Sequence, residues 1–224
     1  MPQPTRPLLP CIEQQTRATV DAAVIWLHGL GADGHDFVPI IPQLNLPSSL
    51  AIRFVFPHAP AIPVTVNGGY VMPAWYDIRA MDIDQEVDLA GLLASVARLC
   101  DLIDNEIERG IASDRILIAG FSQGGAVAYQ CCLSATRPLA GLLAMSTYFA
   151  SSDTITLTQA NSTLPIEIQH GTFDPVVPER LGQQAYQFLT GHGYRAHYRT
   201  YPMEHSVCPA QITDIANWIE AVLG

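Results

Sequence analysis

The chain has 224 residues, 49% of them hydrophobic and 14% charged, and a formal net charge of −10 at pH 7. Such a length and composition suit one well-buried globular domain over residues 1–224 and exclude a disordered or fibrous protein. Proteins that bind the phosphate backbone concentrate Lys and Arg. This chain has only 11 of the two together, so we expect no nucleic-acid partner.

Segments that target or anchor a protein are not expected in this chain. Residues 1–10 lack the continuous apolar stretch of a signal peptide. No run approaches the roughly 20 apolar residues that span a bilayer. The 5 cysteines are an odd number without CxxC spacing, which favours reduced core thiols and disfavours a zinc site. We therefore expect a cytoplasmic protein with no transmembrane segment and no metal.

Short apolar runs rich in β-branched residues alternate with longer helical patterns along the chain. The runs predict strands over residues 23–28, 52–57, 116–120, 141–146, 166–171 and 197–202. Apolar spacings of three and four residues predict helices over residues 87–108, 124–134, 179–190 and 210–223. Hydrophobic strands joined by helices indicate an α/β fold with a single mostly parallel sheet and helices on both of its faces.

The first predicted strand ends in the sequence WLHGLG, residues 26–31. It matches the His-Gly turn that supplies a backbone oxyanion donor in α/β-hydrolases. We expect that donor to be the N–H of Leu30, and we interpret His28 as a structural residue that fixes the turn. The following glycines do not complete a G-x-G-x-x-G fingerprint, so no nucleotide cofactor is expected.

Residues 58–84 are rich in Pro, Gly and aromatic residues and show no clean period. An irregular insertion of this length is usually functional. We expect a short lid or acyl-binding loop, with Met72, Trp75, Ile78 and Met81 as candidates to line an apolar channel. The same side chains could equally pack onto the core, and the pattern does not choose between these two interpretations.

The pentapeptide GFSQG, residues 120–124, lies between a predicted strand and a predicted helix. It matches the G-x-S-x-G nucleophile elbow, in which a strained turn projects the serine oxygen at the carboxyl edge of the sheet. We predict Ser122 as the nucleophile. The backbone N–H of Gln123, at the start of the helix, is the second expected oxyanion donor.

A serine nucleophile needs a base that is itself held by an acid. In α/β-hydrolases these residues follow in the order Ser, Asp or Glu, then His. Asp174 and His205 each follow a predicted strand in that order, so we predict His205 as general base and acid and Asp174 as the residue that orients it. Asp153 and Glu204 are rival acids that fit less well.

Four segments together resemble the carboxylesterase and acyl-protein thioesterase family, and most closely its bacterial branch. They are HGLGADG at residues 28–34, PVTVNGGYVMPAWYDI at 63–78, GFSQGG at 120–125 and DPVVP at 174–178. The resemblance implies an α/β-hydrolase with a short lid, hydrolysis of carboxylic esters and acyl thioesters, no metal or organic cofactor, and a homodimer. One departure is Glu204, because the family usually has glycine immediately before the catalytic histidine.

The favoured function is that of a serine carboxylesterase that works through an acyl-enzyme on Ser122. The alternatives are an acyl-protein thioesterase or lysophospholipase acting on long acyl chains, and a non-catalytic binding protein. A cysteine hydrolase would need Cys at the elbow, and a prolyl peptidase would need a larger cap domain. The sequence does not choose between small esters or thioesters, lipids and acylated proteins as substrates.

Overall fold

The computed structural model describes residues 6–80 and 86–224 and contains a sheet of seven strands in the order β1-β3-β2-β6-β7-β8-β9. Their bounds are β1 Cys11–Gln15, β2 Ala22–Leu27, β3 Ile52–Pro57, β6 Ile116–Phe121, β7 Gly141–Met145, β8 Ile166–Gly171 and β9 Ala196–Tyr201. All neighbouring strands pair in parallel except β1, which is antiparallel to β3. The predicted strands are confirmed, and β1 is an addition that sequence analysis missed.

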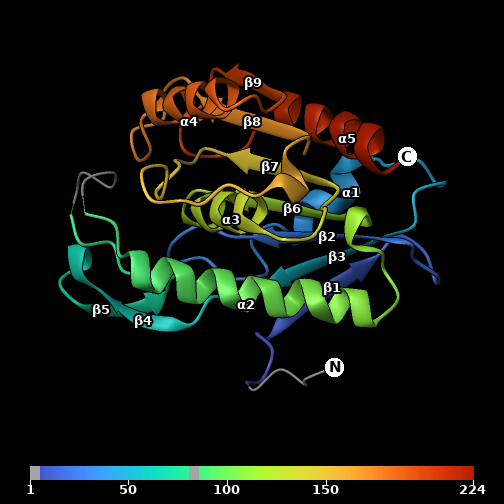
Figure 1. The fold of residues 1–224 in the computed structure, drawn as a ribbon, viewed down its shortest axis with the longest axis horizontal. Coiled ribbons are helices and arrows are strands. Elements are labelled where there is room, and N and C mark those ends of the chain that lie inside the picture. Colours follow the sequence, from blue (N-terminus) through green and yellow to red (C-terminus); the bar gives the residue numbers. More distant parts are fainter. Residues whose placement is uncertain (1–5, 81–85) are drawn as a thin grey trace.

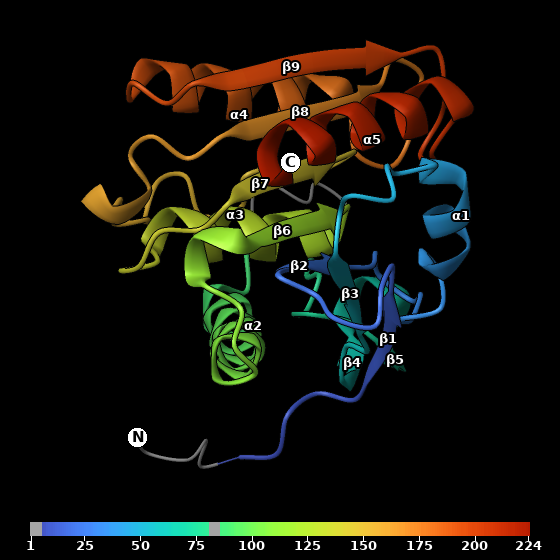
Figure 2. The same ribbon diagram turned by 90° about the vertical axis from the view of Figure 1, so that its right-hand side faces the viewer.

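Helices cover both faces of this sheet (Figure 2). Helices α2, α3 and α4 lie on one face, and α1 and α5 lie on the other. Their bounds are α1 Ile41–Leu44, α2 Leu89–Glu108, α3 Gln123–Ser134, α4 Glu179–Gly191 and α5 Pro209–Leu223. This arrangement confirms the α/β-hydrolase fold class. No helix among the described residues is both long enough and apolar enough to cross a membrane.

Strand β2 shows why the sequences of the central strands are continuous apolar runs. All of its residues are buried. Ala23, Ile25 and Leu27 pack on the side of α2 and α3, whereas Val24 and Trp26 pack on the side of α1 and α5. Because side chains alternate between the faces of a strand, a sheet covered on both faces needs apolar residues at every position.

The insertion after β3 contains regular structure. Strands β4 (Ala61–Val64) and β5 (Tyr70–Pro73) form an antiparallel hairpin, which lies at the carboxyl end of the sheet strands (Figure 1). Its turn runs through Gly68 and Gly69, both with positive φ angles, which glycine adopts without a steric penalty. The expectation of an irregular segment is therefore wrong over 61–73, where sequence analysis missed two short, largely exposed strands.

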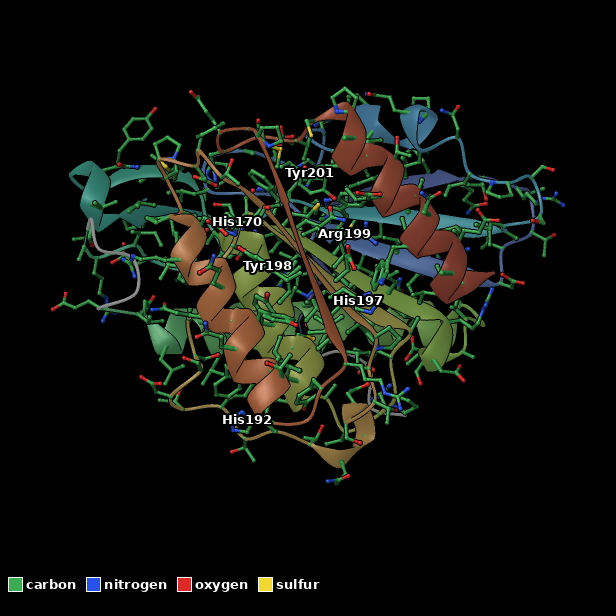
Figure 3. The ribbon with its side chains drawn as sticks, turned by 90° about the horizontal axis from the view of Figure 1, so that it is seen from above. His170, His192, His197, Tyr198, Arg199 and Tyr201 are labelled. Carbon is green, nitrogen blue, oxygen red and sulfur yellow. The ribbon has the colours of Figure 1, made fainter. Side chains whose placement is uncertain are left out.

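Strand β9 forms one edge of the sheet and runs between α4 and α5 (Figure 3). The hydroxyl of Tyr198 donates to Glu179 of α4 at 2.7 Å, and the hydroxyl of Tyr201 donates to Asp214 of α5 at 2.8 Å. Arg199 forms an ion pair with the buried Glu167 of β8 at 2.9 Å. Side chains of β9 therefore fasten the edge strand to both flanking helices and to its neighbour.

Candidate active site

Ser122 connects β6 to α3 with φ 54° and ψ −124°. A positive φ is uncommon for a residue with a side chain, and such strain persists only where surrounding contacts impose it. The Ser122 N–H donates to the Met145 carbonyl at 3.0 Å, and the Thr147 hydroxyl donates to the Ser122 carbonyl at 2.6 Å. Both peptide groups of the turn are thus held by the end of β7.

The glycines beside Ser122 allow backbone segments to approach closely. A Cβ atom on Gly120 would lie 2.5 Å from the carbonyl oxygen of Gly124, and one on Gly124 would lie 2.6 Å from the carbonyl oxygen of His28. Real Cβ atoms do not make such contacts, so the tight turn and its packing against the end of β2 require glycine at both positions. The G-x-S-x-G pattern therefore has a direct steric cause.

Asp174 and His205 are joined by a hydrogen bond of 2.7 Å between Asp174 Oδ2 and His205 Nδ1. Asp174 Oδ1 accepts from the backbone amides of Val176 and Val177 at 2.9 and 2.8 Å. Burial raises the pKa of the Asp174 carboxyl, but its hydrogen bonds with His205 and the two amides outweigh burial and hold that pKa below its usual value. The ionised carboxylate directs the Nδ1 proton toward itself.

The imidazole of His205 lies beside the elbow. Its ring centre is 4.7 Å from that of Phe121, the residue immediately before Ser122. Among the described residues, no hydrogen bond joins Ser122 Oγ to His205 in this conformation. A cavity of about 340 Å³ opens next to His205, with Phe37, Ile40 and Phe121 among its apolar lining residues.

The rival acids are both exposed and make no hydrogen bond to His205 among the described residues. Asp153 is exposed and borders a separate cavity of about 320 Å³ between the loop after β7 and helix α4. Glu204 is exposed. Neither carboxylate bonds to His205 within the part of the chain that the structure describes.

The turn after β2 approaches the elbow through its backbone. A Cβ atom on Gly29 would lie 3.4 Å from Ser122 Cβ, so the main chain that leads to Leu30 lies close to the serine. Gln123 is the first residue of α3, and the N–H groups of a first helical turn have no partner within the helix. The His-Gly turn therefore lies close to Ser122, and the Gln123 N–H lies at the start of the helix that follows Ser122.

His28 is buried and fixes this turn. Its Nδ1 donates to the Gly29 carbonyl at 2.7 Å, and its Nε2 accepts from the Ala59 amide at 3.1 Å. Burial lowers the pKa of His28, which keeps the imidazole neutral, as one donor and one acceptor require. This is the structural role that the sequence interpretation gave it.

The Gln123 side chain has a role that sequence analysis missed. Its Oε1 accepts from the Trp75 amide at 2.8 Å, and its Nε2 donates to the Tyr76 carbonyl at 2.7 Å. On helix α2, the Ser95 hydroxyl donates to the Trp75 carbonyl. Helices α2 and α3 thus both hold Trp75 through buried hydrogen bonds, and α3 holds Tyr76 as well.

The predicted acyl-channel residues separate into different places. Trp75 and Ile78 are only 2% and 8% exposed and belong to the core, and the Trp75 indole donates to the His28 carbonyl at 2.9 Å. Met72 is half-buried, with its sulfur 3.8 Å from where a Gly31 Cβ would lie. Met81 lies outside the described residues. In this conformation Trp75 and Ile78 follow the core-packing alternative, and Met72 lies beside the turn after β2.

His170 is a buried neighbour of Asp174 that sequence analysis did not single out. Its Nε2 donates to the Val177 carbonyl at 2.8 Å and lies 3.7 Å from Asp174 Oδ2. Burial lowers the pKa of His170, so the ring is neutral and supports the Asp174 loop without adding a charge. A Cβ on Gly182 would lie 2.5 Å from His170 Nδ1, so α4 leaves room for this ring.

One group of side chains has metal-ligating atoms close together. Ligand atoms of Asp33, His35 and His58 lie within 4.8 Å of one another. These side chains already form hydrogen bonds within the loop after β2 and to it. Asp33 Oδ1 bonds to His35 Nδ1 at 3.0 Å, and His58 Nδ1 accepts from the Gly34 amide at 3.2 Å. No metal-site spacing marks this group in the sequence, because His58 lies beyond the next strand. The group lies outside the Ser122, Asp174 and His205 arrangement.

Comparisons with known proteins agree on one family. A family model described as Phospholipase/Carboxylesterase matches residues 11–223. An acyl-protein thioesterase 1 from Neurospora crassa is 40% identical, over 95% of this chain and 89% of that protein. The crystal structure of Arabidopsis thaliana SOBER1 is similar with a TM-score of 0.83 and 30% identity, covering 91% of this chain and 99% of that one. Zea mays acyl-protein thioesterase 2 gives a TM-score of 0.84 and 25% identity, over 96% and 99%.

Proposed function

Because this chain belongs to the phospholipase/carboxylesterase family and is a serine hydrolase, we propose that it cleaves carboxylic esters and acyl thioesters through an acyl-enzyme on Ser122. The observation that carries the proposal is the 2.7 Å hydrogen bond between Asp174 and His205, beside a serine held in the elbow conformation. A serine, a histidine and an aspartate so arranged perform nucleophilic acyl transfer.

In the first half of the reaction, His205 Nε2 takes the proton of the Ser122 hydroxyl as Oγ attacks the carbonyl carbon. The resulting oxyanion accepts hydrogen bonds from the backbone N–H groups of Leu30 and Gln123. Each donor of this kind lowers the barrier by about 2.7–4 kcal/mol. The glycines that bring the turn after β2 close to the elbow support this pair of donors.

In the second half, His205 gives its proton to the departing alcohol or thiol, and the tetrahedral intermediate collapses to the acyl-enzyme. A water molecule, deprotonated by the same imidazole, then attacks the acyl carbon and releases the acid and Ser122. Asp174 stays ionised throughout and stabilises the imidazolium. The cavity beside His205 gives the leaving group room next to the residue that protonates it.

The substrate class follows from the relatives. Acyl-protein thioesterase 1 is the name of the N. crassa relative at 40% identity, which favours acyl thioesters as the second candidate beside simple carboxylic esters. Met72 beside the oxyanion turn is the described residue placed best to contact an acyl chain. Measurements of kcat/KM for matched esters and thioesters from two to sixteen acyl carbons distinguish the two: a steep rise for long thioesters identifies a thioesterase, and a short-chain optimum for esters a general carboxylesterase.

The triad assignment is tested by Ser122→Ala. This variant should lose hydrolysis of p-nitrophenyl butyrate to the background rate, while its far-ultraviolet circular dichroism and melting temperature stay close to those of the parent. Ser49→Ala, at an exposed position, is the matched control and should keep full activity. Retention of more than a few per cent of the activity by Ser122→Ala would refute the mechanism.

Three further expectations belong to the same proposal: residues 1–224 form one domain, the protein is cytoplasmic, and it is a homodimer. The continuous sheet flanked by helices on both faces supports the first. The cysteine usage supports the second, and the family resemblance supports the third. Size-exclusion chromatography with light scattering decides the oligomeric state, because a mass of one chain would contradict the dimer.

A further inference from the structure

Helices α2 and α3 lie side by side over the face of the sheet (Figure 1), and each contributes a cysteine to their contact. Cys100 Sγ of α2 and Cys131 Sγ of α3 are 4.0 Å apart. At this separation the two thiols are hydrogen-bonded but not covalently linked, because a disulfide needs a sulfur-sulfur distance of about 2.05 Å. Forming the bond would need the two sulfurs to come about 2 Å closer.

The two thiols differ in accessibility. Cys100 is exposed, whereas Cys131 is only 1% exposed. The expectation of core thiols is therefore wrong for Cys100, because its position on α2 faces outward while its sulfur reaches back to α3. Cys100 is the more accessible residue of this partly buried pair, so an oxidant in solution meets it first, and the Cys131 sulfur lies next to the Cys100 sulfur.

The two thiols also differ in acidity. The hydrogen bond with Cys131 lowers the pKa of Cys100 despite burial of its sulfur, and the same bond, together with burial, raises the pKa of Cys131. Elsewhere, burial raises the pKa of Cys11 to about 12. Because the thiolate is the reactive form, Cys100 is the thiol that reacts first.

We propose that Cys100 and Cys131 form a modification site at which a low-molecular-weight disulfide, such as oxidised glutathione, converts the two thiols into an intramolecular disulfide. The Cys100 thiolate attacks the glutathione disulfide, forms a mixed disulfide and releases one glutathione thiolate. Cys131 then attacks the Cys100 sulfur and releases the second. The two protons of the protein thiols go to the released glutathione, so two protein thiols are oxidised and one glutathione disulfide is reduced.

The disulfide would join the two helices that hold the insertion next to the elbow. Helix α3 begins directly after Ser122, and the Gln123 side chain of α3 and Ser95 of α2 both bond to residue Trp75. The link closes a loop between positions 31 residues apart, which restricts the unfolded chain. For a chain of this size, we expect the melting temperature to rise by about 5–10 °C on oxidation and to return with dithiothreitol.

The experiment treats the full-length protein with oxidised glutathione, blocks remaining thiols with N-ethylmaleimide and maps peptides without reduction. The parent should yield a cross-linked peptide pair containing Cys100 and Cys131, with no glutathione retained on either. Cys131→Ser should stop at a stable glutathione adduct on Cys100. Cys208→Ser, at a half-buried cysteine elsewhere, is the matched control and should behave as the parent does.

Several results would overturn the proposal. They are a stable glutathione adduct on Cys100 of the parent, a disulfide between two chains through Cys100, and a cross-link that leaves the melting temperature unchanged. Cys100→Ser, which changes an exposed residue, keeps the test valid if a substitution at the buried Cys131 disturbs folding. It should prevent both the adduct and the rise in melting temperature.

Discussion

The hydrogen bonds of Asp174 allow the effect of Asp174→Asn to be worked out in detail. Two backbone N–H groups, from Val176 and Val177, point at Oδ1, and His205 Nδ1 faces Oδ2. Because Oδ1 faces only donors, the asparagine oxygen must take that position. Its NH₂ group then faces His205 Nδ1, which has to become an acceptor. The imidazole proton moves to Nε2, and His205 no longer accepts the proton of Ser122.

A triad with the wrong histidine tautomer loses about 10⁴-fold in kcat, as found for the same substitution in a chymotrypsin-type protease. That loss corresponds to about 5 kcal/mol of transition-state stabilisation. The assay is kcat for p-nitrophenyl butyrate at pH 8, with the melting temperature measured in parallel. Asp153→Asn, at the exposed rival acid, is the control and should stay within twofold of the parent. A kcat for Asp174→Asn within tenfold of the parent would refute this orientation of the imidazole.

Three further predictions concern stability. Gly124→Ala would bring a Cβ within 2.6 Å of the His28 carbonyl oxygen and should lower the free energy of unfolding in urea by about 1–3 kcal/mol. The control Gly191→Ala, where a Cβ meets nothing within 4 Å, should leave it unchanged. Equal effects of the two substitutions would contradict the steric argument. Gln123→Leu leaves two buried backbone groups of segment 75–76 unpaired and should destabilise the fold by about 2–6 kcal/mol, so a loss below 1 kcal/mol would be inconsistent with the bridge. Burial lowers the pKa values of His28 and His170, so below about pH 6.5 the unfolded chain binds protons that the folded chain does not. The free energy of unfolding should therefore fall with decreasing pH, by at most about 2.7 kcal/mol per pH unit. Urea unfolding at pH 7.5 and 5.5 measures this change, and equal values at the two pH values would contradict it.

Most of the strands that sequence analysis predicted are buried at every position; these are β2, β3, β6, β7 and β8. Strand β2 is apolar at every position, and its run of small and branched side chains identifies it without further information. Strand β1 was missed because its sequence, CIEQQ, is half-buried or exposed throughout and lacks the continuous apolar run of the buried strands. The β4–β5 hairpin was missed for the same reason, since most of its residues face solvent and its periodicity is weak.

In the candidate site too, some residues could be predicted from the sequence and others could not. Ser122, Asp174 and His205 could be named in advance because the elbow pattern and the order of strand ends determine where such residues come together. The bridge from Gln123 to the insertion could not, because its partners lie 47 and 48 residues away and are backbone groups that leave no signature in the sequence. The burial of Trp75 likewise depends on its bond to the His28 carbonyl, a contact that composition does not report.

The fastening of β9 has a consequence for how copies of the protein can meet. No described strand pairs with the outer side of β9, so its backbone could in principle accept a strand from another molecule and extend the sheet between chains. Exposed charged groups on an edge strand oppose such growth. His197 and Arg199 project beside α5 (Figure 3), and Arg199 is paired with Glu167 of the same chain. We therefore expect assembly, where it occurs, to use helix or loop surfaces, and concentrated solutions to resist fibril formation seeded at this edge.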